Sequence, residues 1–414
     1  MLRKEIVLQK ILRILAGAVL KKYQSRVVAV TGSVGKTTAK EMIFRVLSGD
    51  KLKVWKSQKN YNNELGIPLA ILGISGEKKN WWGWLSVLLR AGQLIIFPNN
   101  YADVLVLELA ADSRGDIKYF CSFIPIEVGV VTNVGISHLK KFGSQKAIFE
   151  EKTYLLKRAK EVAIYNRDSL EVESLKLKQK TYSYACEKKA DFKADDIDYF
   201  YKKDKRLPQG LVFTVKHQEK SMVIKLEGLF GRGYIYGVLA ALAVAQYFAI
   251  DLNKAKKRLE KTKPLSAHLE VIQGRRGAII INDVYNSAPD SLREALRLVK
   301  DLPAERRWLV LGDMLELGEF EDSAHREVGE LLSSGEKNFV LVTVGERMKL
   351  AGEEYQKRTG NKFFAFAKAA EAGRWLRKKI RKGDVVLAKG SRGMKMEEAV
   401  KELVTGKKAK IKNS

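Results

Sequence analysis

Residues 26–48 read RVVAVTGSVGKTTAKEMIFRVLS and contain three local patterns in succession. A short β-branched apolar run comes first, then a turn with two glycines, then a segment with helical periodicity. Together they predict a strand, a loop and a helix. In that context the backbone N–H groups of the loop and the helix N-terminus bind phosphate oxygens. The sequence therefore favours a nucleotide-binding loop, and a plain glycine-containing turn is the alternative.

The expected nucleotide ligands lie in TGSVGKTT, residues 31–38. Lys36 is expected to reach the β and γ phosphates, and Thr37 to offer its hydroxyl to Mg²⁺. Asn62 and Asn63 could supply an amide to the phosphates, with the capping of a turn as the alternative. The loop residues assigned to the nucleotide are Gly32, Ser33, Gly35, Lys36, Thr37 and Thr38.

Further apolar runs along the chain predict parallel strands, because helix-length segments separate them. Residues 180–227 instead predict short antiparallel strands that decorate the first block, and residues 233–250 predict a buried helix. The predicted fold class is α/β, with a central P-loop ATPase domain built on a parallel sheet and a C-terminal Rossmann-like domain. The predicted strands are 104–110, 128–134 and 161–166 in the first block, and 278–283, 307–313, 339–345 and 384–390 in the second.

The predicted domain boundaries follow these blocks. A basic amphipathic helix takes residues 1–25, and the ATP-binding domain takes residues 26–263. The C-terminal domain takes residues 264–404, and a basic tail takes residues 405–414.

The composition is that of a globular protein, with 46% hydrophobic and 30% charged residues. The 76 Lys and Arg against 48 Asp and Glu give a formal net charge of +28, which excludes an acidic disordered chain. Two cysteines, Cys121 and Cys186, cannot build a disulfide framework, so the reducing cytoplasm is the expected compartment.

Two segments suggest peripheral contact with the inner face of a membrane, although no uninterrupted apolar stretch reaches the roughly 18 residues of a membrane span. Residues 80–98 carry three tryptophans beside a nearly apolar helix, a composition typical of membrane interfaces. The N-terminal helix is expected to gather its apolar residues on one side, with Lys and Arg opposite. Packing of both segments into the core is the alternative. The apolar residues of the N-terminal helix are Ile6, Leu8, Ile11, Leu12, Ile14, Leu15, Val19 and Leu20.

Ordered motifs from about Arg26 to about Val404 resemble those of the Mur ligase family, the ATP-dependent muramoyl-peptide synthetases. The loop itself resembles that family, because it has Val30 where the general P-loop pattern has glycine. The other motifs are KNYNNELGIP (59–68), LELAADSRGDI (107–117), TNVGISHLKKFGS (132–144), IFEEK (148–152), NDVYNSAPDSLREAL (282–296), LGDMLELGEFEDSAH (311–325) and AKGSRGMKMEE (388–398).

The resemblance implies an ATP- and Mg²⁺-dependent ligase that joins an amine to a carboxylate through an acyl phosphate. The motifs are similar to those of family members that add D-alanyl-D-alanine to a muramoyl-tripeptide in peptidoglycan synthesis. One alternative is a ligase for a different, lipid-linked or polymeric, acyl acceptor. Another is a non-ligase ATPase or a basic binding module, although no nucleic-acid motif is recognisable. The expected partners are ATP, the muramoyl peptide and D-alanyl-D-alanine, with no nucleic acid and with the chain as a monomer.

The resemblance also implies two Mg²⁺ ions. Glu108, at the end of an apolar strand, would share one ion with Thr37, and His138 would bind the second. The lysine that corresponds to Lys152 is carbamylated by CO₂ in the family, which turns a cation into an anionic metal ligand. From the residues alone, a surface carboxylate, a helix-capping imidazole and a solvated lysine remain the alternatives for these three positions.

The C-terminal block presents polar residues at two strand ends. Asp283 and Asn286 follow one strand, and the resemblance assigns their segment to the ATP ribose and to closure of the catalytic site. Lys389, Ser391 and Arg392 follow another strand, where a guanidinium could hold a substrate carboxylate through two hydrogen bonds. A basic loop is the alternative for these three residues.

The chain departs from the family pattern at three places. Only about 25 residues precede the first predicted strand, so the usual N-terminal uridine-binding domain is expected to be missing. Gly233 and Gly237 stand where the family tends to have His and Asn, which changes the expected contacts to the nucleotide base. His268 stands where an Arg is expected, unless Arg275 or Arg276 replaces it.

Overall fold

The computed structural model divides into two compact units by its internal contacts. The first unit contains Met1–Ile197, Phe213–Ile224 and Gly233–Thr262, and the remainder of the chain forms the second. The residues that the structure describes are 3–49, 51–58, 61–74, 81–135, 142–170, 175–201, 207–264, 267–315, 317–334 and 339–405.

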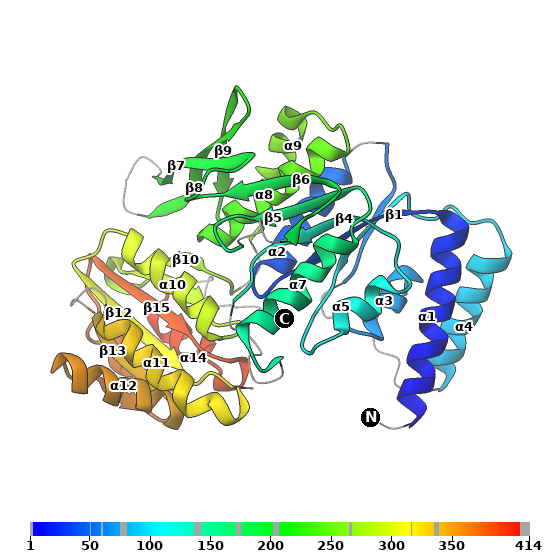
Figure 1. Ribbon diagram of the computed structural model, residues 1–414. Helices are drawn as coiled ribbons and strands as arrows, with labels where there is room; N and C mark the ends of the chain where they lie inside the picture. The colour runs from blue at the N-terminus through cyan, green and yellow to red at the C-terminus, as the bar shows by residue number, and fades with distance from the viewer. Residues whose placement is uncertain are drawn as a thin grey trace. The chain divides into compact units, whose positions relative to one another are not determined.

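A parallel sheet forms the centre of the first unit (Figure 1). β1 lies between β3 and β4, with the register Val30↔Glu108 on one side and Val30↔Val130 on the other. The strands in spatial order are β2 (Val54–Lys56), β3 (Val104–Glu108), β1 (Arg26–Thr31), β4 (Ile126–Val131), β5 (Val162–Asn166) and β6 (Lys180–Ala185), continued by β7 (Phe192–Tyr201), β8 (Pro208–His217) and β9 (Lys220–Glu227).

β6 corrects the expectation of antiparallel strands in residues 180–227. It pairs in parallel with β5 and extends the main sheet, and the last four of its six residues are buried. Thirteen residues separate β5 from β6, which is enough chain for a parallel crossover. The sequence reads as a short polar strand because the first two residues of β6 are exposed.

Helices cover both faces of this sheet. Successive residues of β1 point to opposite faces. On one face Val27 and Ala29 join a core with residues of α1 (Arg3–Tyr23), α3 (Gly66–Ile71), α4 (Trp81–Ile96), α5 (Asp116–Cys121) and α7 (Gln145–Arg158).

On the other side, α2 (Lys36–Leu47) contacts β1 and β3 and packs closely against α8 (Arg232–Tyr247). A Cβ added to Gly237 of α8 would lie 2.8 Å from Sδ of Met42 and 3.0 Å from Cγ2 of Thr38. The glycine that replaces a polar residue of the family pattern therefore allows close approach to the helix that follows the loop. The predicted buried helix at residues 233–250 is confirmed by α8.

α1 and α4 lie side by side and are joined at their C-terminal ends (Figure 1). Nζ of Lys22 donates to the carbonyl oxygens of Leu94, Ile95 and Phe97 at 2.9, 3.0 and 2.6 Å. Lys22 thus caps the end of α4, where a positive charge also favours the helix dipole. No helix in the described part of the chain is long and apolar enough to cross a membrane.

The apolar residues of α1 do not all share one side, which corrects the expected pattern. Leu12, Ala16, Val19 and Leu20 are buried, as packing of the helix into the core requires. Ile6, Ile11 and Ile14 instead point outward, with side chains that are 41%, 40% and 70% exposed. Their positions, together with Lys10, fall on the opposite arc of a helix that turns 100° per residue.

The second unit is a smaller sheet with helices on both faces, as predicted for a Rossmann-like domain. β10 is the antiparallel edge strand, and the other pairings in this sheet are parallel. In spatial order the strands are β10 (Glu270–Gln273), β11 (Ile279–Asp283), β15 (Asp384–Lys389), β12 (Arg306–Gly312), β13 (Phe339–Val344) and β14 (Phe364–Phe366).

Alternating residues of these strands build two cores. One core joins residues of α10 (Pro289–Asp301), α11 (Glu321–Ser333) and α12 (Glu346–Thr359). The other joins residues of α13 (Ala369–Arg377) and α14 (Glu397–Leu403). The predicted α/β fold class is confirmed.

Candidate active site

The predicted phosphate-binding loop connects β1 to the N-terminus of α2. Gly32 and Gly35 have φ angles of 149° and 79°, where glycine is favoured. A Cβ on Gly32 would lie 2.0 Å from Oγ1 of Thr132, so this position also lacks room for a side chain. The carbonyl oxygen and Oδ1 of Asn133 accept hydrogen bonds from two loop N–H groups at 3.0 and 2.7 Å. The loop is thereby fixed at a helix N-terminus, an arrangement that binds phosphate oxygens.

Lys36 folds back onto this loop. Its Nζ donates to the carbonyl oxygens of Gly32 and Ser33 at 2.8 and 3.1 Å. Burial lowers the pKa of Lys36, and the carboxylates of Glu108 and Asp112 oppose that shift. A partly buried cation with backbone N–H groups close by is well suited to hold an anion.

Glu108 and Thr37 meet beside the loop because β3, which ends at Glu108, pairs with β1. The Thr37 hydroxyl donates to Oε2 of Glu108 at 3.0 Å, and Nδ2 of Asn62 lies 3.4 Å from Oε1. A hydroxyl and a carboxylate are oxygen ligands of the kind that Mg²⁺ binds, so this pair fits the expected metal. Among the described residues, no group of three His, Cys, Asp or Glu could hold a metal ion.

The two asparagines at the start of α3 have different contacts. The Oδ1 of Asn63 accepts a hydrogen bond from N–H of Gly66 at 2.8 Å, which is the turn-capping arrangement. The backbone carbonyl of Asn62 accepts from N–H of Ala110 at 2.8 Å, and its side-chain amide points to Glu108. Of the two, only Asn62 directs its side chain to Glu108.

Lys152 projects from α7 toward the same loop. Its side chain is buried, and Nζ lies 3.5 Å from the carbonyl oxygen of Gly32 and 3.4 Å from that of Ala111. Burial, and then repulsion from Lys36, lower the pKa of Lys152 to about 8. The structure therefore brings together Lys36, Thr37, Glu108 and Lys152, whereas His138 lies outside the described residues.

Two further residues of this cluster were not singled out from the sequence. Glu151 accepts hydrogen bonds from N–H of Gly115 and Ile117 at 2.8 and 2.7 Å, which fixes α7, the helix that carries Lys152, to the start of α5. Lys40 is buried with Nζ 3.1 Å from Oε2 of Glu108. The spacing from Thr37 to Lys40 is a signal that could have found the second, because residues three apart share a helix face.

In the second unit, the predicted residues gather at the neighbouring carboxyl ends of β11 and β15. Nζ of Lys389 donates to Oδ2 of Asp283 at 2.5 Å and to the carbonyl oxygen of Asn286 at 2.9 Å. The side chains of Lys389 and Asp283 are 2% and 7% exposed. This buried pair neutralises both charges, so Lys389 is less available to a substrate than the sequence suggests.

Ser391 and Arg392 follow in the next loop. Oγ of Ser391 accepts a hydrogen bond from N–H of Leu315 at 2.8 Å, and N–H of Ser391 donates to the carbonyl of Asp313 at 3.0 Å. Arg392 is exposed, with its guanidinium 5.9 Å from the centre of the Tyr285 ring. Arg392 is thus the cation of this group that a carboxylate from solution can reach.

Replacing Lys389 and replacing Arg392 are expected to change the free energy of unfolding by very different amounts. Replacing Lys389 with methionine should reduce the free energy of unfolding by roughly 3–5 kcal/mol, because the Asp283 carboxylate is left buried without its partner. Replacing Arg392 with alanine should cost markedly less, because the contacts of an exposed cation remain in water. Urea denaturation followed by tryptophan fluorescence measures both. Equal stabilities of the two variants would contradict the assignment.

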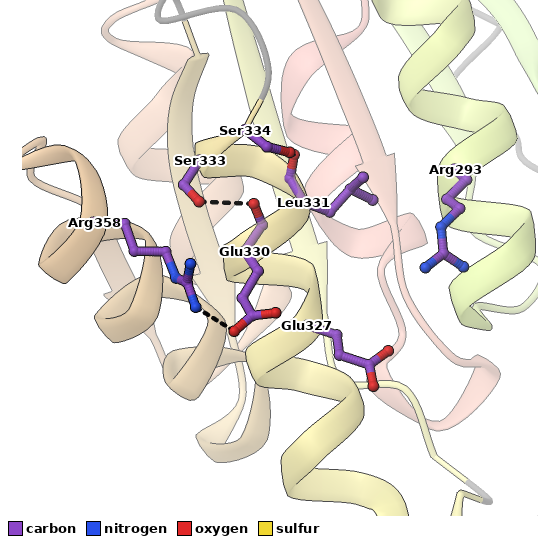
Figure 2. Close-up of a pocket in the computed structure, with 7 residues that line it drawn as sticks. All are labelled: Arg293, Glu327, Glu330, Leu331, Ser333, Ser334 and Arg358. Carbon is purple, nitrogen blue, oxygen red and sulfur yellow. Dashed lines mark hydrogen bonds and ion pairs between the residues drawn. The ribbon is translucent and has the colours of Figure 1, made fainter.

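Figure 2 shows a hollow of about 800 Å³ in the second unit, away from these strand ends. It is lined by side chains of α10, α11 and α12, and an ion pair joins Arg358 to Glu330 across it. Its α11 residues belong to the second half of that helix, toward the start of β13. The hollow is therefore separate from the candidate site.

Comparison with known proteins agrees with this arrangement. The profile described as the Mur ligase middle domain matches residues 30–82 and 90–245, and that described as the Mur ligase glutamate ligase domain matches residues 269–392. A UDP-N-acetylmuramoyl-tripeptide--D-alanyl-D-alanine ligase of Bacillus subtilis (strain 168) is 32% identical over 394 residues, 94% of this chain and 78% of that protein.

Solved structures give the same result. The MurF ligase of Thermotoga maritima in complex with ADP is similar with a TM-score of 0.75 and 25% identity, over 95% of this chain and 83% of that one. A MurF of Acinetobacter baumannii is similar with a TM-score of 0.76 and 26% identity, over 95% of this chain and 79% of that one.

Proposed function

Because this chain belongs to the Mur ligase family, we propose that it is an ATP-dependent ligase that joins D-alanyl-D-alanine to a muramoyl-tripeptide. We propose residues 26–263 as the ATP-binding domain and residues 264–404 as the ligase domain. The observation that carries the proposal is the cluster of Lys36, Thr37, Glu108 and Lys152 around one phosphate-binding loop. Such a cluster places cations and metal ligands where a carboxylate and a triphosphate must meet.

The reaction needs two displacements. A carboxylate oxygen of the muramoyl peptide attacks the γ-phosphorus of ATP, the bond to ADP breaks, and an acyl phosphate forms. The amine of the dipeptide then attacks the acyl carbon, phosphate leaves, and the amine loses a proton. Lys36 would move from the carbonyls of Gly32 and Ser33 to the phosphates and hold the negative charge of the transferring group.

Mg²⁺ would neutralise phosphate charge, and Thr37 and Glu108 are the residues proposed to hold it, with His138 as a ligand of a second ion. Asn62 would orient a phosphate beside Glu108. The proposed carbamate on Lys152 is supported by its depressed pKa, because only the neutral amine reacts with CO₂. In that reaction a nitrogen–carbon bond forms, one oxygen takes the negative charge, and a proton is released.

Residues of the second unit would contact the ATP ribose and a substrate carboxylate. The proposed roles are contact with the ATP ribose for Asp283 and Asn286, and capture of a substrate carboxylate for Arg392. Lys389 would act by fixing Asp283, to which it is bound. Ser391 would fix the loop that carries Arg392, through its hydrogen bond with Leu315.

The substrate is tested by ADP release across a panel of UDP-linked and lipid-linked muramoyl peptides, each with and without D-alanyl-D-alanine. We expect the UDP-linked tripeptide with D-alanyl-D-alanine to give the highest rate. Amine-dependent release with lipid-linked peptides alone would favour the alternative of a lipid-linked acceptor. Release that depends on no amine would sink the ligase proposal.

We also propose that the enzyme contacts an anionic membrane through an outer surface formed by α1 and α4. Among the described residues, twelve large hydrophobic side chains are exposed, and nine of them lie on α1, on α4 or directly after α4. These nine residues form the proposed surface: Ile6, Val7, Ile11, Ile14, Trp82, Leu88, Leu89, Ile96 and Phe97.

The charges near this surface favour lipid over protein. Among the described side chains, α1 contributes four Lys and Arg and no acidic residue, and α4 contributes Arg90 and no acidic residue. Lys10 and Lys21 are exposed, whereas Lys22 caps α4 and Arg13 lies 5.6 Å from the ring centre of Tyr119. Each exposed basic residue near an anionic surface contributes on the order of 1 kcal/mol to binding. Because Lys10 and Lys21 alone give only a weak attraction, most of the binding free energy must come from apolar side chains of the surface that enter the membrane.

Sedimentation with vesicles tests the surface. The double variant Ile14→Glu, Leu89→Glu should lose binding to vesicles that contain phosphatidylglycerol. The matched control Val223→Glu, at an exposed hydrophobic residue outside the surface, should keep it. High salt should weaken wild-type binding without abolishing it. The proposal fails if the wild type does not pellet at low salt. It also fails if the double variant pellets to the same extent as the wild type.

A further inference from the structure

Lys40 is a buried cation on the helix that follows the phosphate-binding loop. It lies one turn after Thr37 on α2, and its side chain is 0% exposed. Removing an ammonium from water is costly unless an opposite charge lies close. The neighbours of Lys40 therefore show what it serves.

Glu108 is the main partner of Lys40. Its Oε2 lies 3.1 Å from Nζ, whereas the nearest oxygen of Glu41 lies 3.9 Å away and that carboxylate is paired with Lys56. Within the described residues, Nζ of Lys40 has no hydrogen-bond partner. Lys40 thus acts on Glu108 through charge and position.

The other contacts of the Glu108 carboxylate are neutral. The Thr37 hydroxyl and the Asn62 amide lie within 3.4 Å of it. Glu108 is itself 6% exposed, so its negative charge also requires a counter-ion. Lys40 is the cation in contact with this carboxylate, and the more distant Lys36 ammonium adds to its stabilisation.

We propose that Lys40 is a positioning residue that holds Glu108 beside Thr37 and makes metal binding depend on the nucleotide. A divalent ion at Glu108 would share the carboxylate with the Lys40 ammonium, and two cations a few ångströms apart repel each other. Phosphate oxygens bring the negative charge that offsets this repulsion, so the metal enters with the nucleotide. The inference rests on the proposed role of Glu108 as a metal ligand.

Binding of Mn²⁺, followed by the electron paramagnetic resonance signal of the free ion, tests the inference with and without ADP. The wild type should bind Mn²⁺ weakly alone and much more tightly with ADP. Lys40→Met should bind Mn²⁺ without ADP at least tenfold more tightly than the wild type, and ADP should add less. The matched control Lys56→Met removes the other lysine that contacts Glu41 and should behave as the wild type. A folded Lys40→Met variant with unchanged or weaker nucleotide-free affinity would overturn the inference.

Thermal unfolding covers the case in which Lys40→Met fails to fold. The double variant Lys40→Met, Glu108→Gln removes both buried charges and should recover most of the lost melting temperature. Without recovery, Lys40 does not serve Glu108 and the inference falls. Neither measurement needs turnover. If the protein joined no amine, the proposed ligase activity would be wrong, but the Mn²⁺ affinities and the melting temperatures would still test the inference.

Discussion

Replacing Lys36 with alanine is expected to lower the rate of ADP release by at least roughly 10²–10³-fold, the loss typical when one group that stabilises transition-state charge is removed. The lysine contacts the carbonyls of Gly32 and Ser33 within its own loop, which places its charge at the proposed phosphate site. The fold should survive, because the loop is also held by Asn133.

A coupled assay for ADP, with the amine and carboxylate substrates saturating, measures this effect. Lys146→Ala is the control, since Lys146 is an exposed lysine of the same unit at the start of α7. Circular dichroism establishes that each variant is folded. Undiminished ADP release by a folded Lys36→Ala protein would show that the loop does not act on the phosphates.

Replacing Lys152 with alanine is expected to leave almost no activity, and added formate or acetate should restore part of it. Removal of the side chain opens space beside the carbonyls of Gly32 and Ala111, which a short carboxylate can enter. An uncharged additive of similar size, such as acetamide, should restore nothing if an anion is what the site requires. A fully active variant would contradict the proposed carbamate.

The depressed pKa of Lys152 predicts how carbamate formation and the stability of the unmodified protein change with pH. With a pKa of about 8, roughly one tenth of this amine is neutral at pH 7, against about three in ten thousand for a lysine at 10.5. Labelling with ¹³C bicarbonate should therefore give a carbamate signal that grows from pH 7 to pH 8.5 and is absent in the alanine variant. Without the carbamate, the unfolded chain binds more protons between pH 8 and 10.5, so this lysine makes stability rise with pH in that window.

The local sequence was sufficient to predict the helices and strands around the phosphate-binding loop. The β-branched run and the helical period at residues 26–48 predicted β1 and α2, and β5 begins within one residue of its predicted start. Residues 180–185 were predicted less well, because a partly covered strand of a parallel sheet can have the same polar pattern as an exposed antiparallel one.

Contacts between distant residues could not be predicted in this way. Asp283 and Lys389 were each placed at a strand end, but their ion pair depends on β11 and β15 being neighbours, which no local pattern shows. The spacing of Lys40 from Thr37 indicates a shared helix face but not burial, because a lysine in the second turn of a helix ordinarily faces water. Its burial depends on Glu108, which is far away in sequence and adjacent in the sheet.

The position of β1 between β3 and β4 affects how the protein is made on the ribosome. β4 ends 100 residues after β1, so the strand that leads into the loop cannot have both neighbours until that length has been synthesised. At typical rates of translation this takes roughly 5–20 s. During that interval the edges of an apolar strand are open to other nascent chains. Early binding by a chaperone, or temporary cover from α1, which is synthesised just before it, would protect this segment from aggregation.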